Sequence, residues 1–232
     1  MNAIEIRGLT KRYGSNRALD TLDLTVPPGQ IVGLIGPNGC GKSTLFKILG
    51  GVLAGWTGDV RIAGHVPGPQ SKARVAFLPD AAFLPGEARL SGIVAWYRDF
   101  FADFDAGRAL SLVETFGLTP QTRLRDMSRG MREKAQIAVT MGRRARVYLL
   151  DEPLSGVDPA ARATVLDQIV RGLDEQSTIL VSTHLVNELE PVLDAVAFMN
   201  AGRIEMAGAV DDLRAERGLS IHQLAQEVST WS

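Results

Sequence analysis

Two kinds of hydrophobic pattern occur along the chain, and they predict two kinds of β-strand. Apolar and polar residues alternate over residues 4–7 and 22–26, which is typical of antiparallel strands with one exposed face. Residues 31–35, 147–150 and 178–181 are nearly continuous apolar runs, which predict central parallel strands covered on both faces. Two further runs have the same character, at residues 74–78 and 195–199. Helical patterns follow several of these runs, so the sequence predicts an α/β fold.

The clearest helix signal begins at Asp158-Pro159, where an N-cap candidate and a proline at the first helical position precede an apolar stripe. Between Leu78 and Val147 no convincing strand pattern occurs, and apolar spacing over residues 90–101 and 109–116 predicts helices. We therefore expect one domain over residues 1–232, with a helical insertion at about residues 82–145.

The last part of the chain predicts a hairpin followed by a helical tail. Residues 203–206 are expected to close the hairpin, and the tail covers about residues 209–232. Ser220 and Gln223 form a candidate capping box for its last helix. The apolar positions of that helix include Trp231, and their spacing favours docking on the domain over membrane anchoring.

Composition and charge narrow the function classes. The 25 basic and 26 acidic residues give a net charge of −1, so there is no bulk electrostatic argument for a nucleic-acid partner. A single cysteine excludes an intrachain disulfide and a cysteine-based zinc site, and favours a reducing compartment. The first residues lack the pattern of a secretory signal, and no apolar run reaches the roughly 18 residues of a membrane span. We expect a cytoplasmic protein whose contact with a membrane is peripheral.

A phosphate-binding motif follows the apolar run 31–35. The segment fits G-x-x-x-x-G-K-[ST] and leads into a helical pattern, which is the context that this motif requires. Its backbone amides and the start of the helix would surround phosphate oxygens, Lys42 would reach the β- and γ-phosphates of ATP, and Ser43 would offer a hydroxyl to Mg²⁺. The candidate nucleotide-binding residues are Gly36, Pro37, Asn38, Gly39, Cys40, Gly41, Lys42, Ser43 and Thr44.

Three polar residues follow buried strands at the edge where open α/β sheets bind ligands. Asp151 and Glu152 come directly after the run 147–150, where Asp151 would hold Mg²⁺ and Glu152 would polarise the attacking water. An isolated Asp-Glu pair is more often a surface turn, but the upstream phosphate loop favours the catalytic interpretation. His184 follows the next buried strand and would donate to a γ-phosphate; the alternative is an ordinary surface histidine.

The order of these motifs resembles that of the ATP-binding subunit of ABC transporters, and the resemblance covers essentially the whole chain. It implies a P-loop NTPase core, an antiparallel N-terminal β-subdomain and an inserted helical subdomain. It also implies that Tyr13 stacks on adenine; the alternative is a packing residue at a strand edge. MSRGM, residues 127–131, stands where the family has its signature segment, and LSGVD, residues 154–158, matches the loop that joins two such domains.

In this family the signature segment contacts the nucleotide held by a second nucleotide-binding domain. The resemblance therefore assigns contacts in trans to Ser128, Gly130 and Asp158, although Ser128 could equally be a plain helix cap. Arg129 and Met131 depart from the family pattern, which puts the geometry of the trans site in question. Asp80 stands where the family usually has a glutamine; it would bind Mg²⁺ or simply start a turn.

The resemblance implies an ATPase that hydrolyses MgATP in a homodimer or heterodimer of nucleotide-binding domains and drives a separate membrane permease from the inner face of the membrane. The alternative is a soluble ABC-type ATPase with a regulatory, nucleic-acid-linked or ribosome-linked role. LPD and SRGM resemble the branch that serves ABC-2-type export permeases. Five aromatic residues in the insertion form either its core or a groove for a helix of the permease: Trp96, Tyr97, Phe100, Phe101 and Phe104.

Overall fold

The computed structural model describes residues 1–229, so Trp231 and the last residues of the predicted tail lie outside the described part. A six-stranded central sheet has the strand order β5-β6-β7-β3-β8-β9, in which the first five strands are parallel and β9 pairs antiparallel with β8. Its strands are β3 (Ile31–Ile35), β5 (Val75–Leu78), β6 (Val147–Asp151), β7 (Thr178–Thr183), β8 (Ala195–Asn200) and β9 (Arg203–Ala209). All five apolar runs of the sequence are strands of this sheet.

A second sheet is antiparallel and three-stranded, with the order β2-β1-β4. It consists of β1 (Ile4–Tyr13), β2 (Asn16–Val26) and β4 (Trp56–Ile62). The sequence analysis did not predict β4. Within this strand only Val60 and Ile62 are buried, so the apolar-polar alternation is confined to its second half. Gly58 adopts a positive φ of 110° next to the backbone of β1, which further weakens the pattern of a strand.

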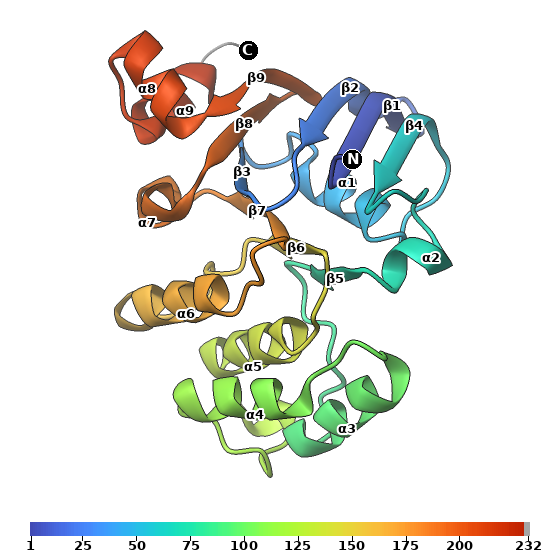
Figure 1. The fold of residues 1–232 in the computed structure, drawn as a ribbon, viewed down its shortest axis with the longest axis vertical. Coiled ribbons are helices and arrows are strands. Elements are labelled where there is room, and N and C mark those ends of the chain that lie inside the picture. The colour runs from blue at the N-terminus through green and yellow to red at the C-terminus, as the bar shows by residue number, and fades with distance from the viewer. Residues whose placement is uncertain (230–232) are drawn as a thin grey trace.

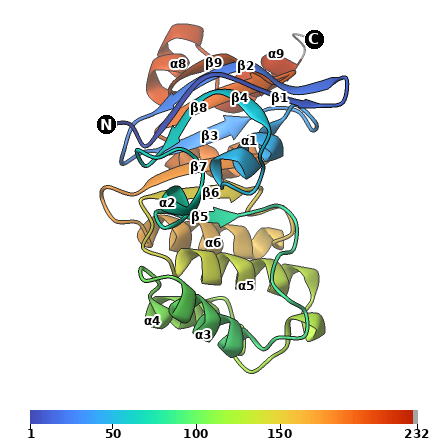
Figure 2. The ribbon, with the colours of Figure 1, turned by 90° about the vertical axis from the view of Figure 1, so that its right-hand side faces the viewer.

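The central sheet separates two apolar cores. Along β6, Val147 and Leu149 point into the core shared with the antiparallel sheet, whereas Tyr148 and Leu150 point into the core on the other face. Helix α1 (Lys42–Leu49) fills the space between the two sheets, as Figure 2 shows. Both faces of the parallel strands are therefore covered, which explains their continuous apolar runs.

The other face of the sheet is covered mainly by helices. Between β5 and β6 the described chain has no strand, and its helices extend away from the sheet at the bottom of Figure 1. None of the helices within residues 1–229 is long and apolar enough to cross a membrane. The helices in and around this segment are α2 (Pro69–Lys72), α3 (Leu90–Phe100), α4 (Ala106–Thr115), a 3-10 turn (Leu124–Asp126) and α5 (Arg129–Met141), followed later by α6 (Pro159–Arg171).

The C-terminal part of the described chain forms a hairpin and two helices. After α7 (Val186–Leu189) and a 3-10 turn (Glu190–Val192), the chain forms the β8–β9 hairpin and the helices α8 (Val210–Arg217) and α9 (Ile221–Ser229). Gly218 ends α8 with a positive φ of 66°. Ser220 and Gln223 exchange backbone-to-side-chain hydrogen bonds of 2.9 and 3.2 Å, which confirms the capping box.

Candidate nucleotide-binding and catalytic site

The predicted phosphate loop joins the end of β3 to the start of α1, so its backbone amides precede the positive end of a helix. Gly39 and Gly41 have positive φ values of 82° and 114°, which a side chain would strain. A Cβ at Gly36 would collide with the carbonyl oxygen of Met199, and one at Gly41 with the carbonyl oxygen of Ala18. The glycines are therefore required by backbone geometry and by close packing.

Lys42 is buried at the start of α1, and its Nζ donates to the carbonyl oxygens of Gly36 and Pro37 at 2.7 and 3.1 Å. The ammonium thus lies within the loop, where phosphate oxygens would be held. Ser43 and Thr44 are half-buried in the same turn. Cys40 is buried, and burial raises the pKa of its thiol, as expected for a small packing residue.

Tyr13 lies at the end of β1, beside the turn into β2, and 48% of its surface is exposed. The Nζ of Lys11 lies 5.1 Å from the centroid of its ring. Lys11 pairs with Leu19 on β2, and Leu19 and Ala18 lie against Gly41 of the phosphate loop. The structure therefore places the exposed ring on the hairpin that packs against the loop.

A second part of the site is built at the carboxyl ends of β6 and β7. Asp151 is buried and accepts a hydrogen bond of 2.6 Å from the hydroxyl of Ser182. The same hydroxyl accepts the backbone N–H of Glu152 at 3.0 Å. The sequence analysis missed Ser182, although a polar residue near the end of a buried strand, two positions before His184, is a usable signal.

Glu152 and His184 are in direct contact. Oε2 of Glu152 lies 2.8 Å from Nδ1 of His184 and also accepts the backbone N–H of His184 at 3.3 Å. Glu152 has a positive φ of 52°, a conformation that costs a non-glycine residue roughly 1 kcal/mol or more. Only 12% of its side chain is exposed, whereas 54% of the side chain of His184 is exposed. A carboxylate is thus fixed beside an accessible imidazole.

The strand register sets the distance between the phosphate loop and the carboxylates. Strand β7 lies between β3 and β6, pairing Ile35 with Thr183 and Asp151 with Ser182. Two strand spacings of about 4.8 Å separate β3 from β6, so the end of β3 and Asp151 are roughly 10 Å apart. The predicted loop, carboxylates and histidine therefore meet along one edge of the sheet.

Asp80 lines a small pocket together with Asp151 and Glu152. Asp80 follows β5, is exposed and lies in a bend of the chain. It therefore lies in a turn and also lies near the two carboxylates. Glu133 and Gln136 of α5 line the same pocket, and the sequence analysis missed both. Oε1 of Gln136 accepts the backbone N–H of Phe83 at 2.9 Å, which ties the segment after Asp80 to α5.

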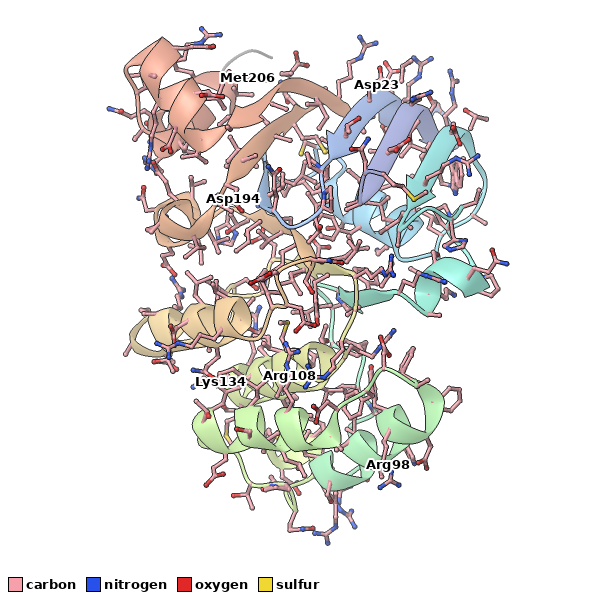
Figure 3. The ribbon with its side chains drawn as sticks, in the orientation of Figure 1. Asp23, Arg98, Arg108, Lys134, Asp194 and Met206 are labelled. Atoms are coloured by element: carbon pink, nitrogen blue, oxygen red, sulfur yellow. The ribbon has the colours of Figure 1, made fainter. Side chains whose placement is uncertain are left out.

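The three predicted trans contacts lie near the starts of two neighbouring helices. Ser128 caps α5 by accepting the N–H of Met131 at 3.2 Å, and Asp158 caps α6 by accepting the N–H of Ala161 at 3.0 Å. Both caps are exposed. Lys134, labelled in Figure 3, joins the two helices through an ion pair of 3.4 Å with Asp158. Gly130 of α5 faces the carbonyl oxygen of Gly156, so the two predicted segments pack together.

Arg129, which replaces the expected glycine, points outward, and helix α5 still begins at this residue with Ser128 as its cap. Its side chain is 74% exposed and pairs with Glu133 at 3.0 Å. An added Cβ at Gly156 would collide with the carboxylate of Glu133. The same acidic side chain therefore contacts Arg129, the loop 154–158 and the pocket of Asp151.

The aromatic residues of the insertion divide into two groups. Tyr97 packs against Phe101 and Phe104, with ring centroids 5.4 and 5.5 Å apart, and burial raises the pKa of Tyr97 to about 12. Trp96 and Phe100 are 54% and 86% exposed. A hollow between the insertion and the core is lined by residues that include Val52, Lys72, Phe77, Tyr97, Phe101 and Arg143. The cluster thus contributes to packing and also leaves two large apolar side chains exposed.

Comparison with known proteins decides the family. The sequence model of the family described as ABC transporter matches residues 19–155. A Streptomyces coeruleorubidus protein named Daunorubicin resistance ATP-binding protein DrrA3 is 34% identical over 226 residues, which cover 93% of this chain and 71% of that protein. The chain belongs to the ABC transporter family. Another relative of this ABC protein, Nod factor export ATP-binding protein I of Cupriavidus metallidurans, is 31% identical and covers 86% of this chain and 69% of its own.

Solved structures agree with this assignment. The structure of an ATP binding subunit of an ABC transporter has a TM-score of 0.89 and 27% identity, covering 98% of this chain and 100% of the other. A dimeric ATP-binding cassette in a post-hydrolysis state, bound to ADP and Pi, has a TM-score of 0.78 at 18% identity and shows the same fold; the match covers 89% of this chain and 98% of the other. The predicted α/β P-loop NTPase fold is therefore confirmed.

Membership of the ABC transporter family also confirms the prediction of an ATP-binding, ATP-hydrolysing transporter subunit. Family membership does not favour the alternative of a soluble ATPase without a permease. The roles of Lys42, Glu152 and His184, and the trans contacts of Ser128 and Asp158, stay predictions from the sequence to which the structure adds geometry.

Proposed function

We propose that this subunit binds MgATP in the loop Gly36–Thr44 and hydrolyses it with Glu152 as the general base. The observation that carries the proposal is the contact of 2.8 Å between Glu152 and His184. His184 follows the strand next to β3, and Glu152 follows the strand after that. In-line attack of water on the γ-phosphate requires a group that orients the water and groups that stabilise charge on the phosphates.

The residues divide this work by position. Lys42 and the loop amides stabilise negative charge on the β- and γ-phosphates. Glu152 accepts a proton from the attacking water, and the nearby imidazole of His184 donates to the γ-phosphate. Tyr13 stacks on the adenine, since it is exposed on the hairpin beside the loop.

The residues near the loop also fit a magnesium ion. Mg²⁺ prefers oxygen ligands and is usually held by one or two carboxylates together with substrate phosphates. The hydroxyl of Ser43 and the carboxylate of Asp151 are oxygen donors on the same sheet edge, and Asp80 is a further carboxylate in the pocket of Asp151. When bound, the ion neutralises charge on the β- and γ-phosphates.

A second nucleotide-binding domain completes each site in this proposal. Ser128 and Gly130 lie at the exposed start of α5, and Asp158 lies at the start of the adjoining α6. Free amides at a helix start attract anions, so this surface suits the phosphates held by the other domain. The second domain is either another copy of this chain or a different cassette.

We further infer that the subunit acts at the inner face of a membrane on a separate permease and has no specific nucleic-acid partner. The hollow lined by Tyr97 and Phe101 suits an apolar segment of that permease, and Phe100, next to Phe101 in the chain, is an exposed apolar side chain. Relatives are named for drug resistance and for Nod factor export, which supports an export permease as the partner.

Replacing Glu152 with glutamine tests the proposed base. We expect Glu152→Gln to bind ATP normally while turnover falls by about 10² or more, because the amide cannot accept the proton. Calorimetric ATP binding and a phosphate-release assay measure the two effects. Lys42→Ala is the matched variant for binding and should weaken ATP affinity. Turnover at the parental rate in Glu152→Gln would remove its role, and unchanged ATP affinity in Lys42→Ala would remove the loop assignment.

A further inference from the structure

The short helix α7 begins two residues after His184 and has only four residues. Its own hydrogen bonds cannot fix its position, since isolated short helices are marginal. Its placement therefore depends on what surrounds it. In Figure 1, α8 and α9 lie above α7 on the same side of the molecule, and α9 contacts both α7 and β8.

Glu190 joins the end of α7 to these C-terminal helices. Its Oε1 accepts hydrogen bonds from Nη2 and Nε of Arg214, at 2.5 and 3.2 Å, and from the backbone N–H of Ile221, at 3.2 Å. Burial alone would raise the pKa of Glu190, but the bonds from Arg214 and the Ile221 amide lower it below its usual value. Only 11% of its side chain is exposed. One carboxylate thus holds α8 and the start of α9 together.

Apolar packing reinforces this connection. Ile221, Leu224 and Val228 on one face of α9 are fully buried. They share a core with Val186 and Leu189 of α7. Moving the C-terminal helices would therefore expose the inner face of α7.

The other side of α7 is fixed to the loop that precedes α6. Nη1 of Arg162 donates a hydrogen bond to the carboxylate of Glu188 at 2.6 Å, and Nε of Arg162 donates to the carbonyl oxygen of Val157 at 3.0 Å. Helix α7 is consequently held from two directions, by α6 and by the C-terminal helices. His184 lies two residues before α7, and 54% of its side chain is exposed. Its side chain is oriented by the contact with Glu152.

We propose that α8 and α9 act as a brace for the catalytic edge, in which Glu190, bound to Arg214 and to the Ile221 amide, positions His184 through α7. Glu190 is a positioning residue and does not touch the nucleotide. The proposal rests on the function proposed above for His184. It predicts that loosening the brace lowers the rate of hydrolysis and leaves ATP binding intact.

A double-mutant cycle in the full chain tests the brace. Glu190→Gln and Arg214→Met should each lower kcat by roughly tenfold, since small misplacement of a catalytic group is costly, while ATP affinity stays at the parental value. In a His184→Ala background the same changes should cause no further loss, because their effect passes through His184. Arg214→Lys, which retains a donor, should recover most of the rate. Asp211→Asn is the matched control, since Asp211 is 97% exposed and lies 3.7 Å from Arg214.

The outcomes separate this inference from the proposed function. If Glu190→Gln fails to fold, Arg214→Met carries the test. The brace would be refuted if its variants kept the parental kcat. It would also be refuted if their losses multiplied with the loss in His184→Ala. In both cases the proposed role of His184 would stand. If His184→Ala alone hydrolysed ATP at the parental rate, the proposed role of His184 would fail, and the brace with it.

Discussion

Ser182 connects the carboxylate of Asp151 to the backbone of Glu152 through one hydroxyl group. It donates to Asp151 at 2.6 Å and accepts the N–H of Glu152 at 3.0 Å, and it is fully buried. Metal binding is the role proposed above for Asp151, and groups behind a metal ligand commonly affect metal affinity or activity by about 10- to 100-fold. A single hydroxyl thus fixes the direction of Asp151 and the backbone that presents Glu152.

Replacing Ser182 with alanine therefore has a specific expected effect. Ser182→Ala should raise the Mg²⁺ concentration needed for half-maximal ATPase activity by about tenfold, since Asp151 loses the bond that orients it. A magnesium titration of the ATPase rate measures this. Ser177→Ala is a matched control, because Ser177 is also buried and its hydroxyl bonds the carbonyl oxygen of Ala145, at 3.2 Å. A shift of equal size in both variants would contradict the role of Ser182.

At the scale of one element, helix α4 begins with a charged cap. Oδ1 of Asp105 accepts a hydrogen bond from the backbone N–H of Arg108 at 2.9 Å, and Oδ2 accepts one from Nη2 of Arg144 at 2.8 Å. The hydrogen bond from the Arg108 amide, followed by that from Arg144, lowers the pKa of Asp105. Because the native pKa is lowered, the charge stabilises the fold above the unfolded pKa of about 3.9, and this contribution is lost as the pH falls through the native value.

Two variants separate the cap of α4 from its charge. Asp105→Ala should lower the free energy of unfolding by about 1 kcal/mol near neutral pH. Asp105→Asn keeps a good cap, so its free energy of unfolding should fall by less near neutral pH. The difference in free energy of unfolding between Asp105→Asn and the parent should vanish as the pH falls below the native pKa of Asp105. Urea unfolding at a series of pH values measures both. A difference for Asp105→Asn that grows on acidification would contradict the assigned sign.

At the scale of the whole molecule, Arg143 connects the helical insertion to the core. Its guanidinium binds both carboxylate oxygens of Asp103, donates to the carbonyl oxygens of Val75 and Lys72 at 3.3 Å, and lies 3.8 Å from the ring centroid of Phe101. Only 3% of its side chain is exposed. This one residue therefore contacts the strand β5, the end of α2 and the segment after α3.

Removing this partly buried ion pair should be costly. Arg143→Met leaves Asp103 without its partner. Breaking a fully buried pair costs roughly 3 kcal/mol or more, and since 24% of the Asp103 side chain is exposed we expect a smaller loss than that, which thermal or urea unfolding measures. The neighbouring Arg144 provides a control, since it is 53% exposed and pairs with Asp105 at 2.8 Å. Exposed pairs contribute less than about 1 kcal/mol, so Arg144→Met should have a small effect. Equal losses in the two variants would show that Arg143 is not the main connection.

The sequence determined features that depend on neighbours along the chain. The apolar runs became the strands of the central sheet, because burial on both faces requires continuous apolar residues. The glycine-rich loop, the caps at Ser128 and Asp158 and the box at Ser220 are local hydrogen-bonding patterns. Strand β4 escaped prediction because packing on β1, a contact between distant segments, stabilises it more than its own pattern does.

Only the tertiary structure decided which distant groups meet. The strand order β5-β6-β7-β3 brings the phosphate loop, Asp151 and His184 to one edge, and no local pattern specifies that order. Contacts between separate segments produce the bonds of Ser182 to Asp151 and to the Glu152 backbone, and the connection from Glu190 to Arg214. The positive φ of Glu152 occurs where β6 and β7 meet. Long-range contacts depend on how whole elements pack, whereas a sequence pattern reports on the few residues within one element.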